Sequence, residues 1–399
     1  MTVTIQGVVF VLTLTITAMT GCFILTPITT IPLILWTKVL GHKEGLVFDV
    51  VHRWNNLIQG TWFYLVSWLL ESMLKVKYDV TLVNSLGKSI EEVLRRPTKP
   101  GKFNIVISNH RTRIDWMLLW MLFAKTDLLF TLKIVLKGEL SSTPFFGWTM
   151  QTFRFLFLSR KWEADKVHLD KVFRYMKLHD ERATFLIFPE GSDLSQSNID
   201  RSSKYATENH LPVFKHVLNP RVTGLLAMKN MIGAENIDRI FDITMGYSDH
   251  PQGGRPNEAS LVNGRMPLRL HFLVSAHTIG ANGVPADDAG FKQWVEKQFE
   301  KKESMLSEFY SSSPCQFAPQ SVKRAYGAAA TVDTKRDVHV PKWSIGLSVI
   351  VWILPSLYVW VRQVVVEQNV LLILYVVAAT AFYVAVSKKF GGIDKWLMF

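Results

Sequence analysis

The sequence predicts an α/β domain, a mixed sheet with flanking helices, joined to N-terminal membrane helices and a C-terminal transmembrane hairpin. Two uncharged stretches indicate the membrane segments, because no charged side chain occurs between Met1 and Thr37 or between Gln368 and Ser387. Soluble chains rarely leave such long stretches uncharged. In the region between them, short apolar runs alternate with segments of helical charge spacing, which is typical of an α/β domain with a largely buried sheet.

Composition excludes several classes of protein. Of the 399 residues, 48% are hydrophobic and only 20% are charged, which excludes intrinsic disorder. The 45 Lys and Arg against 33 Asp and Glu give a net charge of +12, which suits nucleic acid, anionic lipid or a phosphorylated small molecule. Membrane segments at both ends favour the last two, so no nucleic-acid partner is expected. Two cysteines exclude a disulfide framework.

Residues 1–74 are expected to form the N-terminal membrane segment or segments. The apolar run Val8–Trp36 is long enough to cross a bilayer as a helix. Pro27 and Pro32 in its second half predict a kink or an early end of the helix. The following run, Leu57–Leu70, has 14 residues and is rich in Trp and Tyr. That length fits an interfacial or re-entrant helix better than a full span.

Residues 343–399 are expected to form a transmembrane hairpin with a short basic tail. Its two uncharged segments are Trp343–Val361 and Gln368–Ser387, and a short loop separates them. Lysines and an arginine precede the hairpin and three lysines follow it, so the positive-inside rule places both outer flanks in the cytosol. The middle domain precedes the hairpin and is therefore expected in the cytosol too. Residues 311–342 are polar and predict a linker.

The middle domain, residues 75–310, is expected to alternate short strands and helices. Strands are predicted at Phe103–Ser108, Leu132–Leu136, Phe153–Leu158, Thr184–Phe188, Ile240–Gly246 and Leu268–Ser275. Helices are predicted from about Asp115 and at Trp162–His179, Thr223–Ile232 and Phe291–Tyr310. The first of these helices is apolar on every face, which favours a buried core helix; the alternative is a path for an acyl chain or a membrane-facing wall.

Several well-known motifs do not occur. The chain has no G-x-G-x-x-G, no Walker loop, no H-E-x-x-H, no C-x-x-C and no G-x-S-x-G. Nicotinamide, nucleotide-hydrolysing, zinc and serine-hydrolase chemistries therefore have no support. We expect neither a metal nor a cofactor.

The first candidate site is the segment NHRTRID at residues 109–115, directly after a predicted strand. Loops at the carboxyl ends of strands are where α/β folds place their sites. His110 and Asp115 can meet if the histidine lies in the loop and the aspartate begins the next helix, where Asp is favoured. The alternative is an ordinary helix-start aspartate with a surface histidine.

Two further segments carry candidate residues. FPEGS at residues 188–192 follows another predicted strand and places a carboxylate on a glycine turn, where it can bind a hydroxyl or a cation. The segment from Lys137 to Arg160 contains K-G-E-L, then P-F-F-G-W, then F-L-S-R. Alone, each is equally compatible with an ordinary connection between strands.

In this order, the three segments resemble the glycerolipid acyltransferase family, typified by the 1-acylglycerol-3-phosphate acyltransferases. The resemblance covers about Lys102 to Arg221. VLNPRVTG at residues 217–224, the RKW run that begins at Arg160 and the C-terminal hairpin resemble the branch of the family that acts on lysocardiolipin and lysophosphatidylinositol. The wider family usually has Thr-Arg after its Pro-Glu-Gly, whereas this chain has Ser192-Asp193, so acceptor recognition need not follow the lysophosphatidic acid enzymes.

The resemblance implies a membrane-bound enzyme of phospholipid remodelling. It would transfer a fatty acyl group from acyl-CoA, a co-substrate, to the free hydroxyl of a lysophospholipid of the lysophosphatidylinositol or lysocardiolipin type. His110 would be the general base, and Asp115 would fix its tautomer. The substrate-binding residues implied are Lys137, Arg160, Glu190, Gly191, Ser192 and Asp193.

Two alternatives stay open. The chain could be a 1-acylglycerol-3-phosphate (lysophosphatidic acid) acyltransferase, or a lipid-binding membrane protein without catalytic activity. The expected location is the endoplasmic reticulum membrane, as a multi-pass protein with the catalytic domain facing the cytosol. Its expected partners are its substrates, acyl-CoA and the lysophospholipid, and the lipid bilayer.

Overall fold

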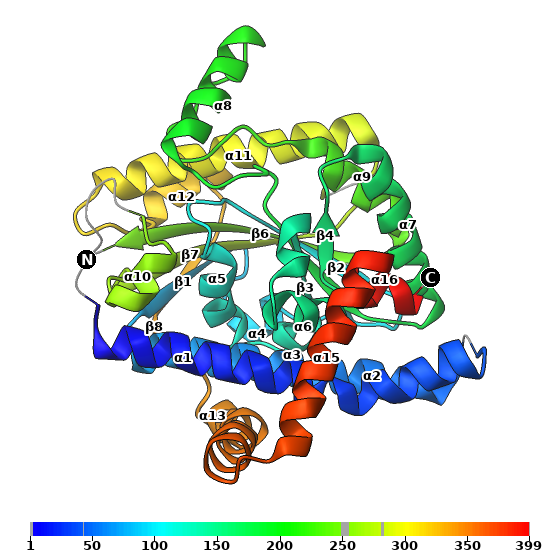
Figure 1. Cartoon of the computed structure of the whole chain (residues 1–399). Helices are drawn as coiled ribbons and strands as arrows, with labels where there is room; N and C mark the ends of the chain where they lie inside the picture. Colours follow the sequence, from blue (N-terminus) through cyan, green and yellow to red (C-terminus); the bar gives the residue numbers. More distant parts are fainter. Residues whose placement is uncertain (1–2, 43, 249–254, 281–282, 399) are drawn as a thin grey trace.

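The computed structural model describes residues 3–42, 44–248, 255–280 and 283–398. They form an eight-stranded mixed sheet with helices on both faces, and long apolar helices lie along one side of this domain (Figure 1). The predicted fold class is confirmed.

Five neighbouring strands of the sheet are parallel, which fixes the position of the candidate site. The strands are β1 (Lys77–Val83), β2 (Phe103–Ser108), β3 (Leu132–Lys137), β4 (Leu156–Leu158), β5 (Ala183–Ile187), β6 (Ile237–Ser248), β7 (Arg269–His277) and β8 (Val332–Val338). Their order across the sheet is β4-β3-β5-β2-β6-β7-β1-β8. From β4 to β6 every pair is parallel, so these five strands end at one common edge. β7 is antiparallel to β6 and parallel to β1, which β8 joins in antiparallel direction.

Apolar side chains on both faces of the sheet belong to two separate cores. Along β2, Phe103, Ile105 and Ile107 face one core and Val106 faces the other, as the two-residue period of a strand requires. The first core is covered by α7 (Trp162–Leu178), α9 (Val222–Ile232), α11 (Asp288–Ser311) and α12 (Pro319–Tyr326). The second is covered by α3 (Leu46–Ser72) and α5 (Asp115–Phe123), with the apolar N-terminal helix beyond them.

Shorter segments complete the domain. They are α4 (Ile90–Val93), η3 (Leu128–Phe130), η4 (Gly138–Ser142), α6 (Phe146–Thr152), α8 (Gln196–Glu208), η5 (Ala234–Asn236), α10 (Glu258–Asn263) and α16 (Ile393–Met398). Helix α8 projects from the body of the domain (Figure 1).

The predicted linker at residues 311–342 is wrong, because this region contains α12 and β8. The strand β8 has the sequence VDTKRDV and pairs with β1 at the edge of the sheet. An edge strand keeps much of its surface in solvent, so its polar composition looked like that of a linker. The predicted strand Phe153–Leu158 is also shortened, because α6 extends to Thr152 and only Leu156–Leu158 pair with β3.

The run Leu57–Leu70, for which an interfacial or re-entrant helix is predicted, is part of a longer helix that is buried against the domain. These residues lie within α3, which has 27 residues and packs against the sheet. Leu65, Val66 and Leu70 are completely buried. Gln59, also completely buried, donates to the backbone carbonyls of Leu129 and Leu132. The apolar and aromatic composition of this run therefore reflects burial inside the domain.

Three helices among the described residues are long and apolar enough to cross a membrane: Ile5–Val39, Lys342–Val366 and Val370–Phe390. The first consists of α1 (Ile5–Thr20), η1 (Gly21–Leu25), α2 (Pro27–Ile34) and η2 (Leu35–Val39). It continues through both prolines without ending early, and a π-helical turn precedes Pro27. The second consists of α13 (Lys342–Ser348), η6 (Val349–Ile353), α14 (Leu354–Ser356) and η7 (Leu357–Val366), and the third is α15 (Val370–Phe390).

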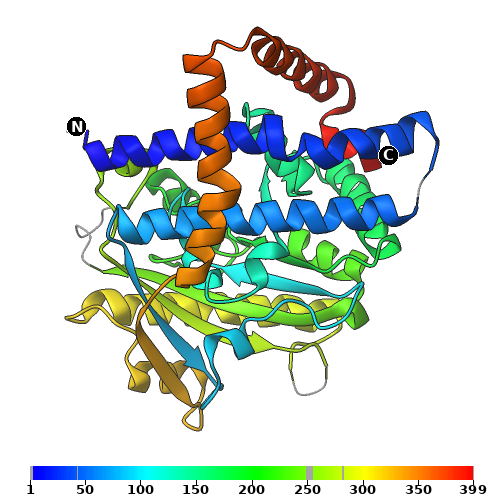
Figure 2. The ribbon, with the colours of Figure 1, turned by 90° about the horizontal axis from the view of Figure 1, so that it is seen from below.

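These helices are not aligned with one another. In Figure 2 the N-terminal helix runs alongside α3, and the helix Lys342–Val366, drawn in orange, crosses both. Polar contacts fix the crossing: Thr20 and Ser356 share a hydrogen bond of 2.6 Å, and the indole of Trp352 donates to Thr61 of α3. The N-terminal helix is half buried in the structure, whereas α15 is largely exposed. The C-terminal hairpin is thus the part with the most surface available to lipid.

Candidate active site

His110 and Asp115 form a hydrogen-bonded pair at the common edge of the parallel strands. His110 lies in the loop after β2, and Asp115 is the first residue of α5. The Nδ1 atom of His110 is 3.1 Å from Oδ2 of Asp115, whose side chain is fully buried. When Nδ1 donates its proton to the carboxylate, Nε2 is the nitrogen that can accept one. The histidine side chain is 17% exposed and can therefore meet a substrate hydroxyl.

The carboxylate of Asp115 has two further donors. The backbone N–H of Thr112 donates to Oδ2 at 2.9 Å, and the hydroxyl of Tyr247 donates to Oδ1. Tyr247 lies near the end of β6 and is buried. Burial, followed by the charge of Asp115, raises the pKa of Tyr247 well above its usual value, so the hydroxyl keeps its proton. Asp115 thus accepts three hydrogen bonds, two on Oδ2 and one on Oδ1.

Asn109 fixes the start of the catalytic loop. Its amide nitrogen donates to the carbonyl of Met245 at 3.0 Å, and its carbonyl oxygen accepts from the N–H of Met245 at 2.8 Å. The side chain is completely buried. Its two hydrogen bonds take the place of backbone–backbone hydrogen bonds between the loop and β6. The ring of Phe188 stacks on that of His110 with centroids 4.2 Å apart. Both contacts restrict the orientation of the histidine.

The buried side chain of Glu190 connects the loop of His110 with the loop of Leu218. Oε1 accepts the N–H of His110 at 2.7 Å, and Oε2 accepts the N–H of Leu218 at 2.9 Å. The side chain is buried, and burial raises its pKa to about 8, against the opposing effect of the two hydrogen bonds. Both oxygens are engaged by backbone amides, so the geometry gives Glu190 a supporting role for the histidine loop.

The turn after Glu190 lies beside two arginines. Gly191 has a φ of +69°, a value that residues with a Cβ atom rarely adopt, which explains the glycine at this position. Its carbonyl oxygen accepts from Nη2 of Arg160 at 2.9 Å. Arg221 is also adjacent to the turn, because its backbone N–H donates to the carbonyl of Pro189 at 2.7 Å. The structure therefore brings Arg160 to the turn, next to the residues with which the family resemblance groups it.

The remaining predicted residues lie on the same edge at different depths. Ser192 and Asp193 follow the turn and are half-buried. The amide of Asn198 donates to the Asp193 carboxylate at 3.3 Å, and Arg201 binds Asn198. Lys137 ends β3 and is exposed, which places it on the rim. Among the described residues, no group of three or more His, Cys, Asp or Glu side chains is arranged to hold a metal ion.

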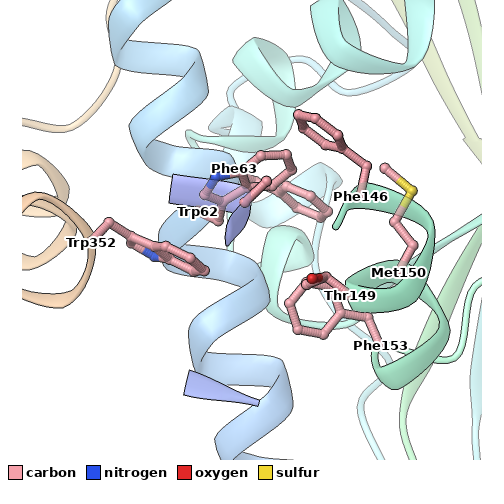
Figure 3. A pocket seen from close by; sticks show the side chains of 8 residues that line it. Trp62, Phe63, Phe146, Thr149, Met150, Phe153 and Trp352 are labelled. Atoms are coloured by element: carbon pink, nitrogen blue, oxygen red, sulfur yellow. The ribbon is translucent and has the colours of Figure 1, made fainter. Parts of the chain in front are cut away.

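A small apolar cavity lies between α3, α6 and the two helices that contain Ala18 and Trp352. Figure 3 shows Trp62 and Phe63 of α3 facing the side chains of α6, with Trp352 approaching from the C-terminal hairpin. Trp62 is also 5.8 Å from Trp120 of α5, measured between ring centroids. Every residue of α5 except Trp116 is buried, so the prediction of a core helix is confirmed.

Tyr247 and the residues beside His110 were not found from the sequence. Asn109 and Arg111 flank the histidine, and their place in the segment NHRTRID was the only local feature that pointed to a role in the site. Tyr247 stands 132 positions after Asp115 and is brought to it by the pairing of β2 with β6. The single feature of the sequence that pointed to Tyr247 was its position at the end of a predicted strand.

Chemically, the arrangement provides a polarised imidazole at a positively charged, partly open edge. A neutral imidazole with an orienting carboxylate can take a proton from an alcohol and stabilise the resulting imidazolium. No side-chain hydroxyl among the described residues is hydrogen-bonded to His110, which leaves its Nε2 available for a hydroxyl from a substrate.

Comparison with known proteins identifies the class to which this fold and site belong. The chain matches two family models, described as Acyltransferase over residues 89–230 and Acyltransferase C-terminus over residues 260–352. It is 31% identical to lysocardiolipin acyltransferase 1 of Mus musculus over 346 residues, which is 86% of this chain and 84% of that protein. It therefore belongs to the glycerolipid acyltransferase family, as the sequence motifs predict.

Two other relatives lie in the same branch. Lysocardiolipin acyltransferase 1 of Danio rerio is 36% identical over 273 residues, which is 68% of this chain and 66% of that protein. Lysophosphatidylinositol acyltransferase 10 of Caenorhabditis elegans is 30% identical over 402 residues, which is 98% of this chain and 93% of that protein. Among solved structures, the 1-acyl-sn-glycerophosphate (LPA) acyltransferase PlsC of Thermotoga maritima matches with a TM-score of 0.41 and 13% identity, covering 77% of this chain and 98% of that one.

Proposed function

We propose that this protein transfers a fatty acyl group from acyl-CoA to the free hydroxyl of a lysophospholipid of the lysophosphatidylinositol or lysocardiolipin type. The observation that carries the proposal is the His110–Asp115 pair, which is held at the edge of the sheet with Nε2 free for an alcohol. The names of the three relatives above support the acceptor class. The apolar helices support an acceptor that is presented by a bilayer.

In the proposed reaction His110 removes the proton of the acceptor hydroxyl. The oxygen attacks the carbonyl carbon of the thioester, the carbon–sulfur bond breaks, and the leaving thiolate takes the proton back from the imidazolium. The products are the acceptor phospholipid with one more acyl chain and free coenzyme A. Asp115 holds the tautomer and stabilises the imidazolium, and general-base catalysis of this kind contributes about 10²–10⁴-fold.

Substrate binding is proposed at the turn beside His110. Arg160 and the Gly191-Ser192-Asp193 turn would bind the head group of the acceptor, with Lys137 as an additional cation on the rim. The acyl chains would approach from the side of Trp116, the one residue of α5 that is not buried. No metal and no cofactor is needed for these steps.

Acceptor choice is proposed to depend on Asp193. The wider family usually has Arg at this position, and a carboxylate would repel a phosphate monoester more than a diester, which carries a single charge. Asp193 does not pair with Arg201, which binds Asn198. Asp193→Arg should shift the ratio of kcat/KM toward lysophosphatidic acid and away from lysophosphatidylinositol. An unchanged ratio would remove Asp193 from acceptor selection.

The direct test supplies purified protein with labelled acyl-CoA and a panel of lysophospholipids. We expect transfer to lysophosphatidylinositol or lysocardiolipin, and its loss in His110→Ala. The matched control is His210→Ala, because His210 is exposed at the end of α8. Preference for lysophosphatidic acid would favour the alternative acceptor. No transfer by the wild type to any acceptor would favour a lipid-binding protein.

We further propose that the protein lies in the endoplasmic reticulum membrane as a multi-pass protein, with the catalytic domain facing the cytosol. The basic residues on both outer flanks of the C-terminal hairpin support this orientation. Lys388 and Lys389 lie in the last turn of α15, where they also complement the negative end of the helix dipole.

A further inference from the structure

One buried cation near His110 is not used by the proposed reaction. Arg111 follows the histidine, and only 8% of its surface is exposed. Its guanidinium lies 4.4 Å from the ring centroid of Tyr310 and 5.6 Å from that of Tyr247. Nη1 donates to the carbonyl of His216 at 3.3 Å, and Nε is buried without a hydrogen-bond partner among the described residues. Buried charged donors are normally paired, so this one lacks an anion.

A second arginine lies close to the histidine loop. Arg255 is half-buried, and Pro256, which follows it, accepts a hydrogen bond from the hydroxyl of Thr112 in the histidine loop. Burial and then the positive charge of Arg111 lower the pKa of Arg255, while the negative charge of Asp193 opposes this effect. The hydrogen bond between Thr112 and Pro256 therefore brings Arg255, a second positive charge, to the histidine loop that carries Arg111.

The surroundings hold Arg111 in a fixed position. Glu303 accepts the N–H groups of Lys215, His216 and Val217 at 2.7–3.1 Å, and so fixes the loop whose carbonyl binds Arg111. The ring of His216 stacks on Tyr310 with centroids 5.5 Å apart. A guanidinium held in this way loses little conformational entropy when it binds a ligand, which favours affinity.

From these contacts we infer that Arg111 and Arg255 form an anion-binding subsite for a phosphate group of a substrate, separate from Arg160 and the Gly191 turn. The inference rests on the proposed acyl transfer, because only then does a phosphate enter beside His110. The planar guanidinium matches two phosphate oxygens, and a buried Nε without a partner supplies one of the donors.

Two sources could supply this phosphate: the head group of the lysophospholipid or the phosphates of acyl-CoA. Substrates that lack the phosphate distinguish them. S-acyl-N-acetylcysteamine replaces acyl-CoA as a donor without phosphates, and monoacylglycerol replaces the lysophospholipid as an acceptor without phosphate. For each variant, the ratio of kcat/KM with and without the phosphate is measured separately for donor and acceptor.

We expect Arg111→Gln and Arg255→Gln to lower this ratio by about 10- to 100-fold for one of the two substrates and to leave the other ratio unchanged. The substrate whose ratio falls is the source of the phosphate. Arg113→Gln is the matched control, because Arg113 lies in the same loop but its side chain is 70% exposed. It should leave both ratios unchanged.

Equal losses with phosphate-bearing and phosphate-free substrates would overturn the inference, because they would show that the arginines only support the histidine loop. If Arg111→Gln does not fold, Arg255→Gln decides, and unchanged ratios in it would likewise overturn the inference. Failure of the proposed function is a different result, since the wild-type protein would then transfer no acyl group from acyl-CoA to any lysophospholipid.

Discussion

Replacing Asp115 by asparagine removes one charge from the candidate site and changes little else. The carboxylate accepts from His110 and Thr112 on Oδ2 and from Tyr247 on Oδ1. An amide can keep its oxygen toward the two N–H donors and turn its NH₂ group toward Tyr247, whose hydroxyl can rotate and accept. The tautomer of His110 would then be preserved. The loss is confined to the charge that stabilises the imidazolium.

The magnitude follows from the distance between the two groups. At 3.1 Å and an effective dielectric constant of about 20, the attraction between the carboxylate and an imidazolium is about 5 kcal/mol. The amide dipole retains part of this, so we expect the barrier to rise by about 3–5 kcal/mol, or a 10²- to 10⁴-fold lower kcat/KM. The KM for the acceptor should change little, because Asp115 is buried beneath the histidine.

The assay measures initial rates of labelled acyl transfer by the purified protein, together with thermal unfolding in the same detergent. Asp127→Asn is the matched control: Asp127 is well exposed and pairs with Arg96. Its rate should equal that of the wild type. Activity of Asp115→Asn within threefold of the wild type, with an unchanged unfolding temperature, would refute the role given to the carboxylate.

Three other predictions follow from the structure. Tyr247→Phe leaves one oxygen of the buried Asp115 carboxylate without its donor and should lower the stability by about 1.5–3 kcal/mol, measured by thermal unfolding; an unchanged unfolding temperature would mean that the hydroxyl contributes nothing. Burial raises the pKa of Glu190 from 4.5 to about 8, so between these pH values the folded state keeps a proton that the unfolded state has lost. The free energy of unfolding of the wild type should therefore fall as pH rises from about 4.5 to 8. Glu190→Gln cannot ionise, so its unfolding temperature should fall less over that range, and parallel curves would contradict the shift. A tag after the last residue should be digested by protease added outside sealed microsomes, because both flanks of the hairpin are expected in the cytosol; protection of the tag until detergent is added would reverse the orientation.

The parts of the site that the sequence predicts are encoded locally. His110 and Asp115 are five positions apart and meet because a loop follows β2 and a helix begins at Asp115. The Glu190-Gly191 turn likewise follows directly from β5. Parallel strands buried on both faces are continuous apolar runs, so most of the central sheet was also predictable.

The unpredicted parts depend on contacts between distant residues. Tyr247 reaches Asp115 only because β6 pairs with β2 in the register that places Ser108 opposite Ile243. The burial of α3 within the domain was not predicted, because a core helix and an interfacial helix share the same apolar and aromatic composition. Local patterns do not state which apolar surface is covered by protein and which by lipid.

The edge strand β8 has a consequence for how the chain is made. Thr81 of β1 and Thr334 of β8 share a hydrogen bond across 253 positions of the sequence. At about 5–20 residues per second, a ribosome needs roughly 13–50 s between the synthesis of these two strands. During that interval β1 has an open edge, and the apolar residues that α12 and β8 cover are exposed. The acyltransferase domain is completed only as the hairpin leaves the ribosome, so a fragment that ends at residue 310 should expose the β1 edge and aggregate.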